Sequence, residues 1–166
     1  MLPHIGIVAL AALVPMIMGF IYYNPKVVGT AWMKASGVTE DKMKGANIPV
    51  IFGLSYLFSF MLALLLFSVV VHQAGLFSLF AGEEGFGVEG SATMNELNGL
   101  MDVLGDRFRT FGHGAFHGTV VGVFIALPIL GTNALFERKG GKYILINVAY
   151  WTITLALMGG VLCQWA

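Results

Sequence analysis

His113 and His117 stand four residues apart, a spacing that places both imidazoles on one face of a helix. Two imidazoles on one face can bind a single transition-metal ion, or each can ligate a haem iron. Histidine is also an ordinary hydrogen-bonding residue at the ends of helices, and two ligands alone are a weak signal for a metal. We therefore expect no bound cofactor, and these residues keep a transition-metal site open as the alternative.

The segments around these histidines are strongly apolar. Hydrophobic residues make up 57% of the chain, charged residues 11%, and the mean hydropathy is +0.82, far from the composition of soluble domains. Four long segments lack Asp, Glu, Lys and Arg, and each would span about 30 Å as a helix, the thickness of the hydrocarbon layer. The sequence predicts an all-α polytopic membrane protein, residues 1–166 forming one membrane domain with transmembrane helices at about 5–23, 48–71, 115–136 and 143–165.

The first apolar segment could instead be a cleaved signal peptide. A signal peptide needs a basic start, and the residues up to His4 include no Lys or Arg. Tyr22, Tyr23 and Trp32 supply aromatic side chains where a retained helix would leave the membrane. We expect the segment to be retained as the first transmembrane helix.

Basic residues are distributed very unevenly among the connections between these segments. The second connection contains only Arg107 and Arg109, whereas the first and third together contain seven basic residues. Because short loops rich in Lys and Arg stay in the cytoplasm, we expect both termini and the second connection to lie outside. The seven are Lys26, Lys34, Lys42, Lys44, Arg138, Lys139 and Lys142.

This topology brings every histidine of the sequence to the same side of the membrane. His4 precedes the first helix and His72 follows the second, so both join His113 and His117 near the outer interface. Metal sites commonly draw imidazoles from several elements, and a nearby glutamate could add a carboxylate. The candidate metal ligands are therefore His4, His72, His113 and His117, with Glu83 or Glu84 as a further donor.

An outer insertion, residues 76–112, occupies most of the second connection. Its first part is rich in glycine and glutamate and predicts a flexible, solvated segment. Thr93 and Glu96 then fit a capping box, and an amphipathic helix is predicted over about 93–111. We expect this helix to rest on the membrane interface or on the bundle; the alternative is a docking face or lid. Its apolar face consists of Met94, Leu97, Met101, Leu104, Phe108 and Phe111.

Small residues recur every four positions in the third apolar segment, at Gly114, Gly118, Gly122 and Ala126. Such a stripe lets another helix approach closely in lipid, within the chain or in a second subunit. Gly159 and Gly160 offer a candidate partner surface in the last helix. On this interpretation a leucine in the centre of the stripe disrupts packing, and an alanine there is milder.

Several functional classes lack support in the sequence. No acid or base lies deep in an apolar segment, although many proton-coupled transporters use an intramembrane carboxylate. There is no nucleophile elbow, phosphate loop or dinucleotide fingerprint, so we do not expect an enzyme. Nothing indicates nucleic-acid binding.

A set of short motifs is distributed along the chain: Gly19-Phe20-Ile21-Tyr22-Tyr23-Asn24-Pro25, Gly29-Thr30-Ala31-Trp32-Met33, His117-Gly118, Phe136-Glu137-Arg138, Ile146-Asn147 and Tyr150-Trp151. As a set, they resemble the bacterial membrane family catalogued as domain of unknown function 1761. The resemblance covers nearly the whole chain except residues 76–109. It implies a small four-helix protein of the bacterial inner membrane without assigning an activity. The insertion is then where a role particular to this chain would lie.

Three hypotheses of function remain. We expect a non-enzymatic membrane scaffold or accessory subunit that acts through helix packing and its outer amphipathic helix, as a homo-oligomer or within a larger membrane complex. The first alternative is a small oligomeric transporter or channel, which Asn133 and Asn147 facing one cavity would support. The second alternative is a metal-binding membrane protein that uses the outer histidines.

Overall fold

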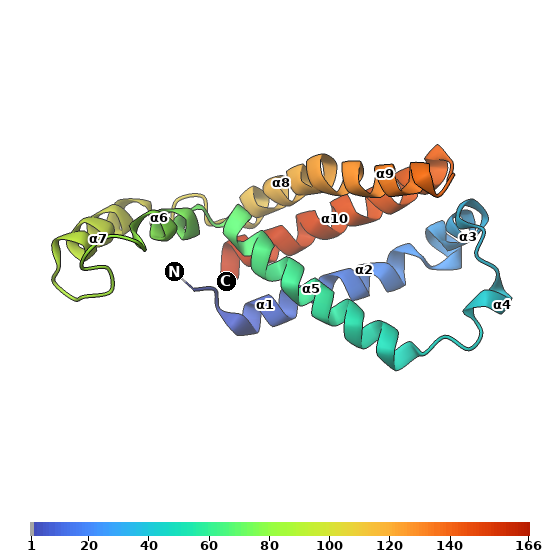
Figure 1. Cartoon of the computed structure of the whole chain (residues 1–166), viewed down its shortest axis with the longest axis horizontal. Coiled ribbons are helices and arrows are strands. Elements are labelled where there is room, and N and C mark those ends of the chain that lie inside the picture. Colours follow the sequence, from blue (N-terminus) through green and yellow to red (C-terminus); the bar gives the residue numbers. More distant parts are fainter. Residues whose placement is uncertain (1) are drawn as a thin grey trace.

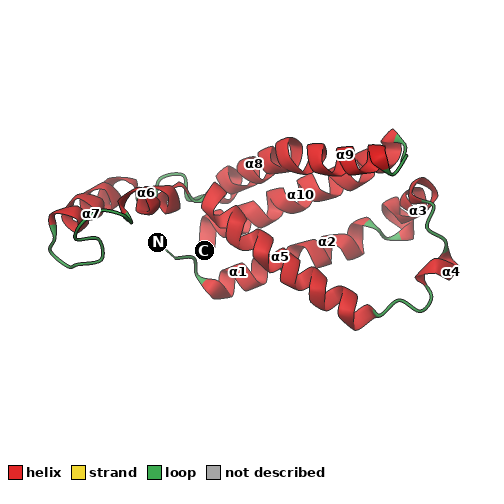
Figure 2. Ribbon diagram, viewed as in Figure 1, coloured by secondary structure: helices red, strands yellow, loops and turns green. Residues whose placement is uncertain are grey.

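The computed structural model describes residues 2–166, and its regular secondary structure over this range is helical (Figures 1 and 2). Four stretches are long and apolar enough to cross a membrane, as predicted: Ile5–Tyr22, Ile48–Val70, Phe111–Phe136 and Gly141–Trp165. Their observed bounds match the predicted ones to within one or two residues, except that the third begins four residues early. The reason is a capping contact, in which the Thr110 hydroxyl accepts from the His113 N–H.

Two of the four stretches are interrupted near a proline. The first consists of α1 (Ile5–Ala11) and α2 (Val14–Tyr22), with Pro15 in the first turn of α2. The third consists of α8 (Phe111–Val121), a π-helical turn (Gly122–Ala126) and α9 (Leu127–Phe136), with Pro128 at the start of α9. Proline lacks the N–H that would continue the ladder, so the backbone changes its hydrogen bonding one turn earlier.

Short helices link the first and second stretches. Asn24 ends the first stretch and its side chain accepts from the Lys26 N–H at 2.9 Å. A π-helical turn (Pro25–Gly29), α3 (Thr30–Ser36) and α4 (Glu40–Met43) follow. The second stretch is the unbroken α5 (Ile48–Val70), and the fourth is α10 (Gly141–Trp165).

The outer insertion forms a helical arm that projects beyond the bundle (Figure 1). We use the word arm for α6 (His72–Phe80), α7 (Ala92–Leu104) and residues 81–91 between them. The helix predicted over about 93–111 begins at Ala92, one residue from the predicted start, but its capping residue and its end are wrong. Ser91, not Thr93, caps α7 by accepting from the Met94 N–H at 3.1 Å, and α7 ends at Leu104.

The apolar face predicted for this helix is correspondingly divided. Leu97 is completely buried, and α7 contacts α6, so this part of the face is covered within the arm. Phe108 lies beyond α7 in a turn, where its φ of 63° cannot belong to a right-handed helix. Phe111 is the first residue of α8. Met94, Met101 and Leu104 remain on α7 with partly buried side chains.

The core lies where α1, α5 and α10 meet, with α8 against α10 on the other side. Ala63, Leu66, Met158 and Leu162 are almost completely buried there. Many other large apolar side chains are exposed, and Phe20 reaches 81%. Outward apolar side chains suit a hydrocarbon solvent, because lipid imposes no cost on their exposure.

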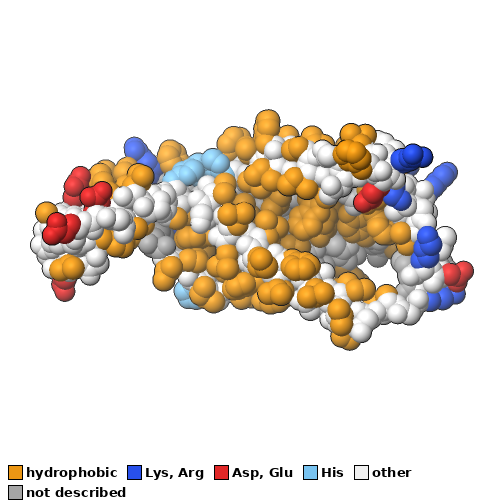
Figure 3. Space-filling view, in the orientation of Figure 1, with side chains coloured by type: hydrophobic (Ala, Val, Ile, Leu, Met, Phe, Trp, Pro, Cys, Tyr) orange, Lys and Arg blue, Asp and Glu red, His pale blue; other side chains and the backbone are white. Residues whose placement is uncertain are grey.

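The two ends of the bundle differ in charge. Both termini and the arm lie at one end, which we call the arm end, while α3, α4 and the turn between α9 and α10 lie at the other (Figure 1). The second end, the basic end, carries the seven basic residues of the first and third connections (Figure 3) and only the acids Glu40, Asp41 and Glu137. The arm end has two arginines and six acids.

Candidate metal centre at the arm end of the bundle

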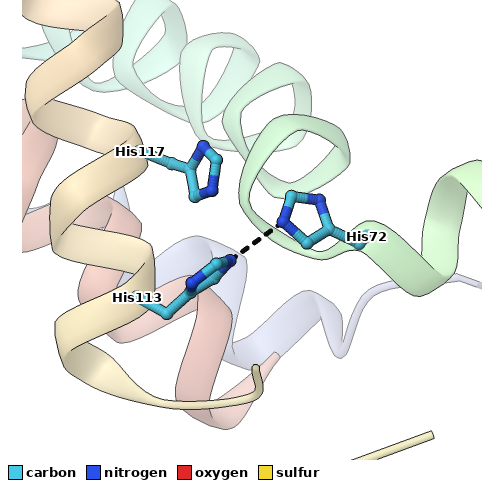
Figure 4. A group of neighbouring side chains, drawn as sticks. All are labelled: His72, His113 and His117. Atoms are coloured by element: carbon cyan, nitrogen blue, oxygen red, sulfur yellow. Dashed lines mark hydrogen bonds between the residues drawn. The ribbon is translucent and has the colours of Figure 1, made fainter. Parts of the chain in front are cut away.

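Three histidines meet where α5, α6 and α8 come together (Figure 4). His72 is the first residue of α6, directly after the extended Val71 that ends α5. His113 and His117 lie one turn apart on α8. The three rings point toward one another, so the break after α5 completes a site that α8 alone would leave with two ligands.

The three rings present nitrogen atoms close enough to share one ion. One nitrogen from each ring lies within 4.8 Å of the other two. Nε2 of His113 is 2.9 Å from Nε2 of His72, and the ring centroids are 4.5 to 5.0 Å apart. With metal–nitrogen bonds of about 2.0–2.1 Å, ligand atoms at tetrahedral angles lie about 3.3 Å apart. Small side-chain rotations would therefore bring all three nitrogens onto one ion.

The contact between His72 and His113 also restricts where protons can sit. One of the two facing nitrogens must donate and the other must accept, because a hydrogen bond needs one of each. Two fully protonated rings would place two N–H groups and two positive charges against each other. The arrangement therefore suits neutral imidazoles, which are the form that coordinates metal.

Aromatic rings support the histidines. Phe108 stacks on His113, with ring centroids 4.9 Å apart and planes inclined by 15°. Phe116 meets His117 edge to face at 5.3 Å. These contacts restrict the ring orientations, as a preorganised ligand set requires.

Gln73 holds the start of the arm in place, and sequence reasoning missed it. Its side chain is buried, and Nε2 donates to the carbonyls of Leu104 at 2.7 Å and Arg107 at 2.9 Å. These bonds tie the first turn of α6 to the end of α7 and so fix His72 beside α8. No periodic pattern marks a glutamine for such a role; its one sequence signal is a polar residue directly after an apolar segment.

The prediction that four histidines gather is wrong for His4. Its Nδ1 accepts from the Ile7 N–H at 3.4 Å and caps α1, and the residue does not belong to the cluster. Glu83 and Glu84 do not belong to it either; both lie in the loop of the arm. Over the described residues 2–166, the cluster is therefore purely imidazole.

The small-residue stripe positions α8 by letting it approach α10. A methyl group added at Gly114 would overlap the carbonyl oxygen of Gly159, and one at Gly118 would overlap that of Leu155. At Gly122 it would lie 2.6 Å from the Cα of Thr152.

Neighbouring residues extend this contact. Ala126 packs at the edge of the core, and the Phe111 ring lies against Gly160. The stripe is thus used within the chain, and His113 and His117, each one residue before a buried glycine, are turned toward α5 and α6.

Comparison with known proteins identifies one family. The family model described as Protein of unknown function (DUF1761) matches residues 7–163, a range that includes the arm. No curated protein and no solved structure matches the chain.

Proposed function

Because the chain belongs to the DUF1761 family, whose function is unknown, we propose a role from its own residues: it is a membrane protein that binds a divalent transition-metal ion at its arm end. The convergence of His72, His113 and His117 carries this proposal. Three imidazoles without a carboxylate suit zinc, copper, iron or nickel better than magnesium or calcium. Three protein ligands also leave a coordination position for water or another molecule, as in catalytic zinc sites.

The scaffold hypothesis finds less support in the same contacts. The glycine stripe is occupied by α10, and the buried Leu97 belongs to a face that α6 covers. Both features that suggested an interaction surface are therefore used inside the chain.

The transporter hypothesis has one observation in its favour. Asn133 and Asn147 line one cavity of about 150 Å³ near the basic end. A path across the membrane would have to continue toward the arm end, where α8 and α10 approach too closely for even a methyl group at Gly114 or Gly118. Any such path would have to form between copies of the chain, so we rank this function second.

Elemental analysis tests the proposed function. Protein purified in mild detergent, without chelator and without a histidine tag, is expected to contain about one zinc, copper or iron ion per chain. Metal-free protein that is nevertheless folded and that takes up no added zinc would contradict the proposal.

The metal content should also depend on pH in a defined direction. Only the neutral imidazole has a free lone pair, so protons compete with the metal as the pH falls through and below about 6.5, where free imidazole titrates. Metal retention is therefore expected to be complete above pH 7 and to decrease on acidification. Retention that is equal at pH 7.5 and pH 4.5 would point to a site that does not use histidine.

The orientation that we propose places the protein in a bacterial inner membrane with the basic end in the cytoplasm. The seven basic residues at that end support it, since short basic loops stay inside. The arm, both termini and the histidine cluster would then face outward. Ser91 caps α7 in the arm, and Gly140 lies in the turn before α10, so the two positions report on opposite ends.

Cysteine labelling in intact cells checks this orientation. With the buried Cys163 replaced by alanine, a cysteine at Ser91 is expected to react with an impermeant maleimide from outside. A cysteine at Gly140 should react only after the cells are opened. The reverse pattern would show that the basic end lies outside.

A further inference from the structure

A large apolar groove lies between α2, α5 and α10, away from the histidine cluster. Its volume is about 510 Å³, and its walls include Phe20 and Tyr23 after Pro15, Phe52 and Phe58 on α5, and Trp151 on α10. Phe20 and Phe58 are 81% and 61% exposed, so the groove opens sideways between these helices. A groove that opens to the side of a membrane protein opens to lipid.

The groove offers hydrocarbon contact and few free polar groups. The Tyr150 hydroxyl donates to the Pro15 carbonyl at 2.7 Å, and the Tyr23 hydroxyl donates to Oδ1 of Asn147 at 2.9 Å. Two of the polar groups at its wall are thus already paired within the protein. An occupant that buries apolar surface without needing hydrogen bonds fits this wall best.

Each wall of the groove leads to a lysine at the basic end. Lys26 lies three residues after Tyr23, and Lys44 precedes α5. Lys142 is the second residue of α10 and lies eight residues before Tyr150. Eight helical residues rise about 12 Å, so Lys142 lies within the length of an acyl chain from the aromatic wall. Lys44 pairs with Asp41 at 2.8 Å, which leaves Lys26 and Lys142 as the two better candidates for an anionic partner.

We infer that this groove holds an acyl chain of an anionic phospholipid whose phosphate lies between Lys26 and Lys142. The apolar wall accounts for the chain, and the basic end accounts for the charge of the headgroup. This site is independent of the metal site, because the two share no residue.

Quenching of tryptophan fluorescence by brominated lipids tests the inference. A variant with Trp32→Phe and Trp165→Phe keeps Trp151 as its single reporter in the groove. This variant is reconstituted in phosphatidylcholine vesicles. Brominated phosphatidylglycerol is expected to quench its fluorescence at a mole fraction at least fivefold lower than brominated phosphatidylcholine does. Each lysine that engages the phosphate is expected to raise the affinity for the lipid by about fivefold. Equal quenching by both lipids would overturn the assignment of an anionic lipid.

Two further variants separate the parts of the proposal. Lys26→Gln with Lys142→Gln is expected to abolish the preference for the anionic lipid. Ser55→Phe, on the groove wall, should reduce quenching by filling the space, whereas Leu57→Phe on the exposed side of α5 is the matched control and should not. If Ser55→Phe and Leu57→Phe behave alike, the lipid does not lie in the groove.

Native mass spectrometry of the unaltered protein keeps the test independent of these variants. Released from vesicles that contain equal amounts of both lipids, the wild-type protein is expected to retain phosphatidylglycerol in preference to phosphatidylcholine. A lipid-free dimer in its place would show that a second copy covers the groove, and would contradict the proposal.

Discussion

Replacing His72 by alanine is expected to lower the zinc affinity of the protein by about 100-fold. Structural zinc sites bind with about 10–16 kcal/mol from four ligands, so one ligand supplies about 3 kcal/mol, which corresponds to a factor of about 100. His72 is the one ligand that comes from outside α8, and its nitrogen lies 2.9 Å from that of His113. Its loss leaves two imidazoles one turn apart on α8.

Competition with a chromogenic chelator in detergent measures this affinity. His4→Ala is the matched control, because His4 also lies at a helix start but caps α1 outside the cluster. It should leave zinc affinity unchanged. If His72→Ala and His4→Ala bind zinc equally well, the cluster is not the site, and the proposed function fails with it.

Gly118→Ala is expected to prevent α8 from reaching its position against α10. The added methyl group would overlap the Leu155 carbonyl and meet the Cα of Ala156 at 2.9 Å, and both are backbone atoms that cannot rotate away. Overpacking usually costs about 1–3 kcal/mol when side chains can adjust. Here whole helices must separate, so we expect a loss above about 3 kcal/mol and little folded protein.

Gly112→Ala provides the control within the same helix. Nothing lies within 4 Å of a methyl group at Gly112, and alanine favours helix over glycine by about 0.5–1 kcal/mol. This variant should be as stable as the wild type or slightly more so. Thermal unfolding in detergent, followed by circular dichroism and size-exclusion chromatography, compares the two. Equal stability of both variants would mean that α8 and α10 do not pack as described.

The stripe illustrates what a sequence pattern can and cannot give. The spacing of Gly114 and Gly118 correctly indicates a close helix contact, but it does not say how near the two helix backbones come to each other. The expectation that alanine is milder than leucine compares only the sizes of the two side chains. In the structure, backbone carbonyl oxygens lie so close to Gly114 and Gly118 that one methyl group would already overlap them.

The transmembrane segments were predictable because the lack of charge over some twenty residues is a strong and continuous signal. The arm was not. The apolar spacing continues through Phe108 and Phe111 without a break, while the chain turns at Phe108 with positive φ and Thr110 starts a new helix. Periodicity reports which residues would share a face, not whether the helix that carries them continues.

The histidine cluster could be predicted from the sequence only in part. Topology correctly brought all four histidines to one end, but the meeting of three rings depends on the extended Val71 and on the rotation of α8 against α10. Neither can be read from spacing. His4 failed to join because the unsatisfied N–H groups at the start of α1 offered its ring a local partner.

The position of His72 and His113 in the chain has a mechanical consequence for the arm. His72 is the first residue of the arm, and His113 lies in α8 beyond the end of the arm. The two residues are 41 apart in sequence and in contact in space, so the segment between them forms a closed loop. The bonds from Gln73 to Leu104 and Arg107 close a second, smaller loop at the same place. A change in the contact between the two rings would therefore act on both ends of the larger loop at once, and so on the position of α6 and α7 relative to the bundle.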